Sequence, residues 1–357
     1  MTKKIFADVH IIQTVPPSCV NRDDTGSPKT AVYGGVTRAR VSSQCWKKAV
    51  RDMFREESVF SADKLGLRTK KIVGVVAEEI RKIDGAVDAD DLAVKILLTA
   101  GLKNINASTA NNDALFFIGA AQAKALAELI LNDPGADKKA AQKALNDSPG
   151  IDVALFGRMV AVDQSLNTDA CAQVAHAIST HRVNNEFDYF TAVDDVSKEE
   201  STGAGHIGTV EFNSSTLYRY ATVAVHLLHD LLSDDAADAV CEFIRAFACS
   251  MPTGKQNTFA NRTIPDAMLI TLRSDQPVNL VGAFEKPVTS DGGFVAGSID
   301  ALTCHTKSIY KNWLKEPDAS FVVGDAANGL GDPMPLFGAL GEFKKSVADM
   351  LAARASN

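Results

Sequence analysis

The pattern of apolar and polar residues predicts an amphipathic helix soon after the N-terminus, from Ser42 to about Arg55. Its apolar residues recur at the spacing of one helix face and form a single stripe: Trp46, Ala49, Val50, Met53 and Phe54. The opposite side carries polar and basic residues: Gln44, Lys47, Lys48, Arg51 and Arg55. Ser42 and Ser43 stand where an N-cap hydroxyl can accept a free N–H group. The sequence therefore predicts a cationic ridge at a helix N-terminus, where free N–H groups and the helix dipole favour phosphate.

Alternation with a period of two predicts a strand over residues 5–15, whose apolar residues fall mainly on one face. Further strands are predicted near residues 151–162, 217–228 and 267–273, and further helices over residues 169–181, 233–250, 299–314 and 339–353. Outside two insertions, the predicted order is β–α–β–α–β with one additional strand. This order predicts an α+β fold on a ferredoxin-like, RRM-type plan.

Two segments interrupt this plan. Residues 61–182 contain four stretches rich in Ala, Leu, Lys and Glu that are separated by Gly, Asn and Asp-Pro, so we expect a helical insertion. Residues 184–217 hold two β-prone pieces on either side of a charged tip that contains glycine, which indicates a long protruding hairpin. Phe190 and Ile207 lie on this hairpin and need a partner to cover them.

Net charge is unevenly distributed along the 357 residues. The first 55 residues contain ten Lys or Arg and four acids, a net charge of +6. Because the whole chain carries −7, the other 302 residues carry −13. Arg22, Lys29, Arg38 and Arg40 precede the cationic helix, with Asp23 and Asp24 as the acids among them. A basic face on an acidic body is typical of nucleic-acid binding, although a solvated charged helix remains the alternative.

Other patterns argue against several classes of protein. The six cysteines include no C-x-x-C pair, which disfavours a disulfide framework and a zinc site. No signal peptide and no apolar run of spanning length is recognised, so we expect a cytoplasmic protein that does not contact membrane. Residues 203–208 match G-x-G-x-x-G but lack a preceding strand and a following helix, so no dinucleotide is expected. Neither a metal nor a cofactor is expected.

Asp23 and Asp24 leave one enzymatic alternative open. Adjacent loop carboxylates can hold Mg²⁺, because hard oxygen ligands suit this ion. Ion pairing with Arg22 and the basic strand is the favoured interpretation.

Several segments, in order along almost the whole chain, together resemble one known family. They are VHIIQTVPPSCVNRDD, YGGVTRARVSSQCWKKAVR, FGRM, HAISTHRV, FDYFTAVDD, HIGTVEFNSSTLYRYA and GKQNTF. The set is similar to the CasC-type backbone subunit of the type I-E CRISPR surveillance complex, Cascade. Residues 60–150 match poorly beyond their helical character.

This resemblance implies a right-hand shape with an RRM-like palm, helical fingers and a β-hairpin thumb. The palm would comprise residues 1–58 and 218–357, the fingers residues 59–181, and the palm edge with the thumb residues 182–217. It further implies a protein that is not an enzyme and that polymerises, in about six copies, along CRISPR RNA. The other implied partners are the target DNA strand paired to the guide, the large and small Cascade subunits, the 5′-handle-binding subunit and the crRNA-processing endonuclease.

The resemblance also suggests residues that bind the RNA. From the palm they are Arg22, Lys29, Arg38, Arg40, Ser42, Gln44, Lys47, Lys48, Arg51, Lys255 and Gln256. From the fingers and thumb they are Arg158, Met159, Phe190, Thr191, His206 and Ile207. Phe190 and Ile207 match thumb residues that wedge bases apart, and Trp46 is expected to be buried. Related type III backbone subunits cut target RNA with a loop aspartate, so a metal-dependent ribonuclease using Asp23 and Asp24 is the alternative function. A general RNA-coating protein is a third.

Overall fold

The computed structural model describes residues 4–103, 105–106, 111–112, 114–160, 163–191, 207–324 and 330–355. Within these ranges, one antiparallel sheet has the strand order β13-β12-β1-β11-β9-β3-β2, and β8 and β10 also pair with β11. Its strands are β1 (Phe6–Ser18), β2 (Thr30–Tyr33), β3 (Val36–Val41), β8 (Ala172–Val174), β9 (Ala177–Ser179), β10 (Glu186–Thr191), β11 (Ile207–Ala224), β12 (Ala267–Arg273) and β13 (Ala319–Gly324). The fold is therefore mixed α+β with an antiparallel sheet.

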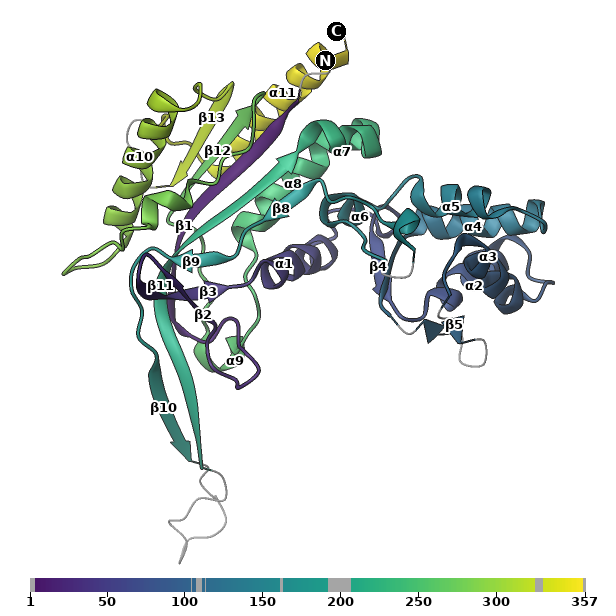
Figure 1. Ribbon diagram of the computed structural model, residues 1–357, viewed down its shortest axis with the longest axis horizontal. Helices are drawn as coiled ribbons and strands as arrows, with labels where there is room; N and C mark the ends of the chain where they lie inside the picture. Colours follow the sequence, from purple (N-terminus) through teal and green to yellow (C-terminus); the bar gives the residue numbers. More distant parts are fainter. Residues whose placement is uncertain are drawn as a thin grey trace, which may run out of the picture.

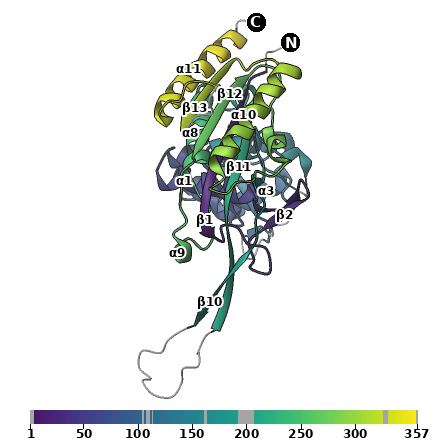
Figure 2. The ribbon, with the colours of Figure 1, turned by 90° about the vertical axis from the view of Figure 1, so that its left-hand side faces the viewer.

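Helices cover both faces of this sheet, and β1 is therefore buried on its two sides. Ala7, Val9 and Ile11 belong to one core, and Ile12 belongs to another on the opposite face. The first core is shared with α1 (Ser43–Glu56), α7 (Val225–Leu232), α8 (Ala236–Cys249) and α11 (Leu336–Ala355). The second is shared with the 3₁₀ helix η4 (Leu280–Phe284) and with α10 (Val295–Asn312). Figure 2 shows α11 and α10 on opposite sides of β12 and β13.

A helical unit lies beside the sheet and has a core of its own (Figure 1). It contains α2 (Ile72–Ile83), α3 (Ala89–Ala100), α4 (Ala120–Asn132), α5 (Lys138–Asn146) and the short strands β4 (Gly66–Thr69), β5 (Ile105–Asn106), β6 (Asn111–Asn112) and β7 (Phe116–Gly119). The chain returns to the sheet through α6 (Ile151–Phe156). Shorter helices are η1 (Ala62–Lys64), η2 (Gln164–Leu166), η3 (Ser233–Asp235) and α9 (Gln256–Phe259). Figure 1 places α1 between the sheet and this helical unit.

The predicted hairpin is present and projects away from the body (Figure 1). It consists of β10 and the first residues of β11, paired from Glu186↔Phe212 to Thr191↔Ile207. Every residue of β10 is exposed, so this segment adds little to the hydrophobic cores. The predicted tip, including most of the G-x-G-x-x-G match, lies outside the described residues.

Several other predictions are confirmed. The amphipathic helix is α1, and its stripe of five apolar residues is buried. Trp46 is only 1% exposed. The strands expected over residues 5–15 and 267–273 and the helices near 299–314 and 339–353 are β1, β12, α10 and α11. Separately from these predictions, the described residues include no helix that is both long and apolar enough to cross a membrane.

Several predictions about secondary structure are wrong. Residues 151–156 form α6 rather than a strand, because a short apolar run buried on all sides reads the same in either conformation. The segment 169–181 contains β8 and β9 rather than a helix, because pairing with β11 and β3 overrides its local propensity. The strand predicted over 217–228 ends at Ala224, and Ser233 starts η3 rather than capping α8.

A candidate nucleic-acid interface

The polar side of α1 forms one wall of a groove of about 950 Å³. All five residues of the predicted ridge line this groove: Gln44, Lys47, Lys48, Arg51 and Arg55. The facing walls come from the helical unit and from the segment that leaves it, and they are lined by Leu67, Arg68, Leu115, Phe117, Phe156, Gly157, Arg158, Met159, Asn167, Thr168, Asp169 and Ala170. A cationic wall therefore faces one that combines apolar and polar residues, among them Met159 at 88% exposure.

Aromatic rings hold two of the ridge cations in place. The Nζ atom of Lys47 lies 6.0 Å from the centre of the Phe156 ring, and Cζ of Arg51 lies 4.4 Å from that of Phe117. Partial burial lowers the pKa of both side chains, and for Arg51 the nearby carboxylate of Asp152 opposes this shift. Because poorly hydrated cations bind anions strongly, Lys47 and Arg51 suit phosphate recognition.

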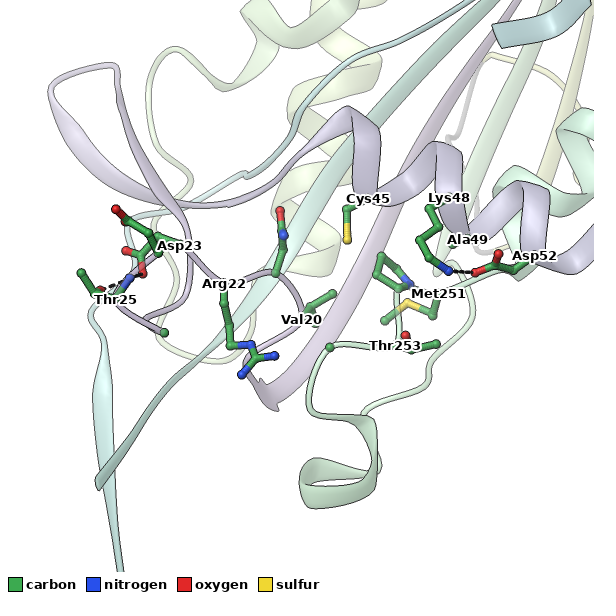
Figure 3. Close-up of a pocket in the computed structure, with 15 residues that line it drawn as sticks. Val20, Arg22, Asp23, Thr25, Cys45, Lys48, Ala49, Asp52, Met251 and Thr253 are labelled. Carbon is green, nitrogen blue, oxygen red and sulfur yellow. Dashed lines mark hydrogen bonds and ion pairs between the residues drawn. The ribbon is translucent and has the colours of Figure 1, made fainter. Parts of the chain in front are cut away.

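Lys48 differs from its neighbour Lys47. It is exposed and forms an ion pair with Asp52, one turn further along α1. Lys48 and Asp52 also line a second cavity of about 570 Å³, so the two hollows adjoin at α1. Figure 3 shows this second cavity, with Arg22 from the loop after β1 and Thr253 from a loop near the C-terminal end of α8.

Close packing of the loops fixes the second cavity. The main-chain N–H of Ser42 donates to Oδ1 of Asn21 at 2.9 Å, which ties the loop after β1 to the start of α1. Ser42 is the N-cap residue, but its hydroxyl makes no capping hydrogen bond and the residue is buried. A Cβ at Gly254 would lie 2.0 Å from the carbonyl oxygen of Val20, so only glycine allows these two loops to touch. This contact places Lys255, a half-buried residue, at the start of α9.

The remaining palm residues that were predicted to bind RNA differ in exposure. Arg22 and Gln256 are exposed, whereas Lys29 and Arg40 are half-buried. Nε of Arg40 donates to the carbonyl oxygen of Thr30, and its Nη1 lies 3.1 Å from Nδ1 of His176. Arg22 is thus the most open cation of the predicted loop and strand.

The guanidinium groups of Arg38 and Arg158 lie inside the protein, so both residues are less accessible than the other predicted cations. Arg38 is 0% exposed and donates to the carbonyl oxygens of Tyr33, Ser179 and Phe284. Arg158 is 4% exposed and donates to several main-chain carbonyls, including that of Leu166 at 2.8 Å. Burial lowers the pKa of Arg158 to about 10. In these positions the two side chains stabilise the fold through their hydrogen bonds to main-chain carbonyls.

The predicted hairpin residues follow the ridge at a long distance in the sequence and lie on a separate projection. Phe190 is 42% exposed and its ring covers Gly208, where an added Cβ would lie 2.3 Å from Cζ of the ring. Thr191 is exposed and its main chain pairs with that of Ile207. His206 lies outside the described residues. The predicted hairpin residues that the structure describes therefore do not line the groove of the same chain.

Asp23 is engaged by its own loop. Its Oδ1 accepts hydrogen bonds from the Thr25 hydroxyl at 2.7 Å and from the main-chain N–H groups of Thr25 and Ser27 at 3.0 Å. The Thr25 hydroxyl is the main cause of a pKa of Asp23 below its ordinary value. In the described ranges, no group of three or more His, Cys, Asp or Glu side chains is placed to hold a metal ion.

The sequence analysis named Met159 but missed the other apolar residues of the groove, and it missed the residue that holds Arg51. Leu115 and Phe117 fall in a segment that was interpreted as helical, and no local pattern marks them as groove residues. Asp152 had a recognisable signal, because it is a single carboxylate within the apolar run IDVALF. Such a residue is buried only if it finds partners for its charge.

Comparison with known proteins adds to this geometry. A family model described as CT1975-like protein matches residues 7–335. A search of curated proteins finds no match. A chain of a "CRISPR RNA-guided surveillance complex, pre-nicking" is 32% identical, with 97% of this chain and 100% of that chain covered and a TM-score of 0.78. A chain of a "CRISPR RNA-guided surveillance complex" is 29% identical, with 96% and 99% covered and a TM-score of 0.63.

Proposed function

The chain belongs to the CT1975-like family, and from this premise we propose that it is a non-catalytic, RNA-binding subunit of a CRISPR RNA-guided surveillance complex. More specifically, it serves as the CasC-type backbone subunit of a type I-E Cascade complex. Several copies assemble along one CRISPR RNA and hold it for base pairing with target DNA. The observation that carries this proposal is the groove beside α1, in a chain whose solved relatives are named as parts of such complexes.

The chemistry of the groove suits a guide of variable sequence. Lys47 and Arg51 offer positive charge to phosphates, which are the same for every nucleotide. Leu67, Leu115 and Met159 offer apolar surface to bases, whose faces are sequence-tolerant partners. Sequence reading is then left to pairing between the guide and the target strand.

In this proposal the sheet with its helices is an RRM-like palm, formed by residues 1–58 and 218–357. Residues 59–181 are the fingers, although β8 and β9 at their end pair into the palm sheet, and residues 182–217 are the palm edge and the thumb. The thumb of one copy crosses the RNA held by the next copy, and Phe190 and Ile207 wedge one base out of the stack. The assembly also contains the large and small subunits, the 5′-handle-binding subunit and the processing endonuclease. It acts in the cytoplasm.

The test is to sequence the RNA that copurifies with the protein from cells that carry a CRISPR array. The proposal expects RNA of uniform length with a repeat-derived end. RNA of mixed length and origin would instead favour a general RNA-coating protein, and absence of RNA would overturn RNA binding.

A further inference from the structure

Asp152 is a fully buried carboxylate that joins three elements. Its Oδ2 accepts hydrogen bonds from Nε of Arg51 and Nη2 of Arg55, each at 3.1 Å, and both arginines belong to α1. Its Oδ1 accepts the main-chain N–H of Gly66, the first residue of β4, at 2.6 Å. Asp152 itself belongs to α6. One side chain therefore links the cationic helix to both connections between the sheet and the helical unit.

The contact with β4 requires close approach of the main chain. A Cβ added at Gly66 would lie 2.5 Å from Cγ2 of Val153 and 3.1 Å from Oδ1 of Asp152. Nη2 of Arg55 also donates to the carbonyl oxygen of Gly66. The peptide groups around Gly66 thus take part in the same cluster as the two arginines.

The cluster leaves Arg51 oriented toward the groove. Of the N–H groups of Arg51, only Nε–H donates a hydrogen bond to Asp152. Within the described residues, neither terminal NH₂ group of Arg51 has a hydrogen-bond partner. The guanidinium also rests on the ring of Phe117, and its side chain is 17% exposed. Because one carboxylate faces two guanidinium groups, the cluster keeps one net positive charge beside the groove.

We propose that Asp152 is a positioning residue for nucleic acid: it holds Arg51 with its free NH₂ groups toward the phosphates and fixes α1 against the helical unit. This inference rests on the proposed RNA-binding function. It contradicts the simplest electrostatic expectation, in which a negative charge near the groove only repels RNA. Removing the negative charge of Asp152 therefore distinguishes positioning from repulsion: RNA affinity falls if Asp152 positions Arg51, and it rises if Asp152 only repels RNA.

The experiment compares the full-length wild type with Asp152→Asn for binding to a labelled, mixed-sequence single-stranded RNA over a range of salt concentrations. Asparagine keeps the shape of the Asp152 side chain, but its NH₂ group would face the N–H donors of Arg51, Arg55 or Gly66 and could not accept their hydrogen bonds. We expect affinity to fall about tenfold, as for loss of one charge-assisted hydrogen bond, and the salt slope to fall by about 0.7. Unchanged or tighter binding by the folded variant would overturn the positioning role.

Asp163→Asn is the matched control, because Asp163 forms an ion pair with Lys138 in the helical unit and lines neither cavity. It should lower stability without changing the salt slope. If Asp152→Asn does not fold, Arg51→Lys replaces it: this variant keeps the charge but loses Nε, and wild-type affinity would overturn the inference. Failure of the wild type to bind RNA would overturn the proposed function itself, which separates the two failures.

Discussion

Adjacent lysines on α1 should contribute unequally to RNA binding. Lys47 is half-buried against Phe156, and no carboxylate in the described part of the chain lies within ion-pair distance of it. Lys48 is paired with Asp52, so removing both members of that pair changes no net charge. We therefore compare Lys47→Gln with the double variant Lys48→Gln, Asp52→Asn.

The magnitude follows from counterion release. Each phosphate contact to a single strand contributes about 0.7 to the slope of log affinity against log salt. Loss of the Lys47 contact should lower the slope by about this amount, so a fourfold rise in salt shrinks the penalty of Lys47→Gln about 2.6-fold. The double variant should keep the wild-type slope, because an ion pair brings little net charge to the phosphates.

The assay is fluorescence anisotropy with a labelled single-stranded RNA at several salt concentrations, on variants whose thermal unfolding matches that of the wild type. Lys139→Gln, on the exposed side of α5, controls for loss of one charge elsewhere. An equal loss of slope in Lys47→Gln and in the double variant would refute the reasoning, since pairing with Asp52 would then be irrelevant. A salt slope of Lys47→Gln equal to that of the wild type would also refute it.

Three further predictions concern other parts of the molecule. Phe190→Ala with Ile207→Ala should remove about 1–3 kcal/mol of base-contact free energy per site. In the assembled complex, regularly spaced guide bases should then lose their distinct chemical reactivity. A modification pattern identical to that of the wild type would reject the role of these two residues as a wedge. Asp23→Asn with Asp24→Asn should leave target DNA binding largely intact, and RNA cleavage in Mg²⁺ by the wild type but not by this variant would establish the enzymatic alternative. Burial raises the pKa of Asp8 to about 6; the folded state therefore holds this proton more tightly than the unfolded state, and stability relative to Asp8→Asn should fall by up to about 3 kcal/mol between pH 4 and pH 7. Denaturant unfolding across this range tests it, and a difference that does not vary with pH would contradict it.

The opposite linkage at His10 explains why the last comparison uses a variant rather than the wild type alone. Burial lowers the pKa of His10 to about 3, so its contribution to stability rises as pH increases toward 6.5. The two residues lie on the same strand, β1, and their effects oppose each other over much of this range. The His10 contribution is common to the wild type and to Asp8→Asn, so it largely cancels in the difference.

Local patterns by themselves determined much of this protein. The period of α1 determined which side would be buried, because a helix with one apolar stripe has only one way to cover it. The same period placed Lys47 and Arg51 together on the exposed side, and both line the groove. Alternation along β1 likewise predicted a strand whose apolar face enters the core. These properties depend on neighbours within two turns or a few residues.

Only the tertiary structure decided which charges face outward. Arg38 looks like part of a basic surface strand, yet its partners are carbonyl oxygens of Ser179 and Phe284, more than a hundred residues away. Asp152 is likewise defined by Arg51 and Gly66, far from it in sequence. A guanidinium or carboxylate is stable either in water or against buried partners, and the residue type is the same in both cases. Whether a given charged side chain is exposed or buried depends on which segments of the chain come into contact, and these contacts are set by the packing of the whole chain.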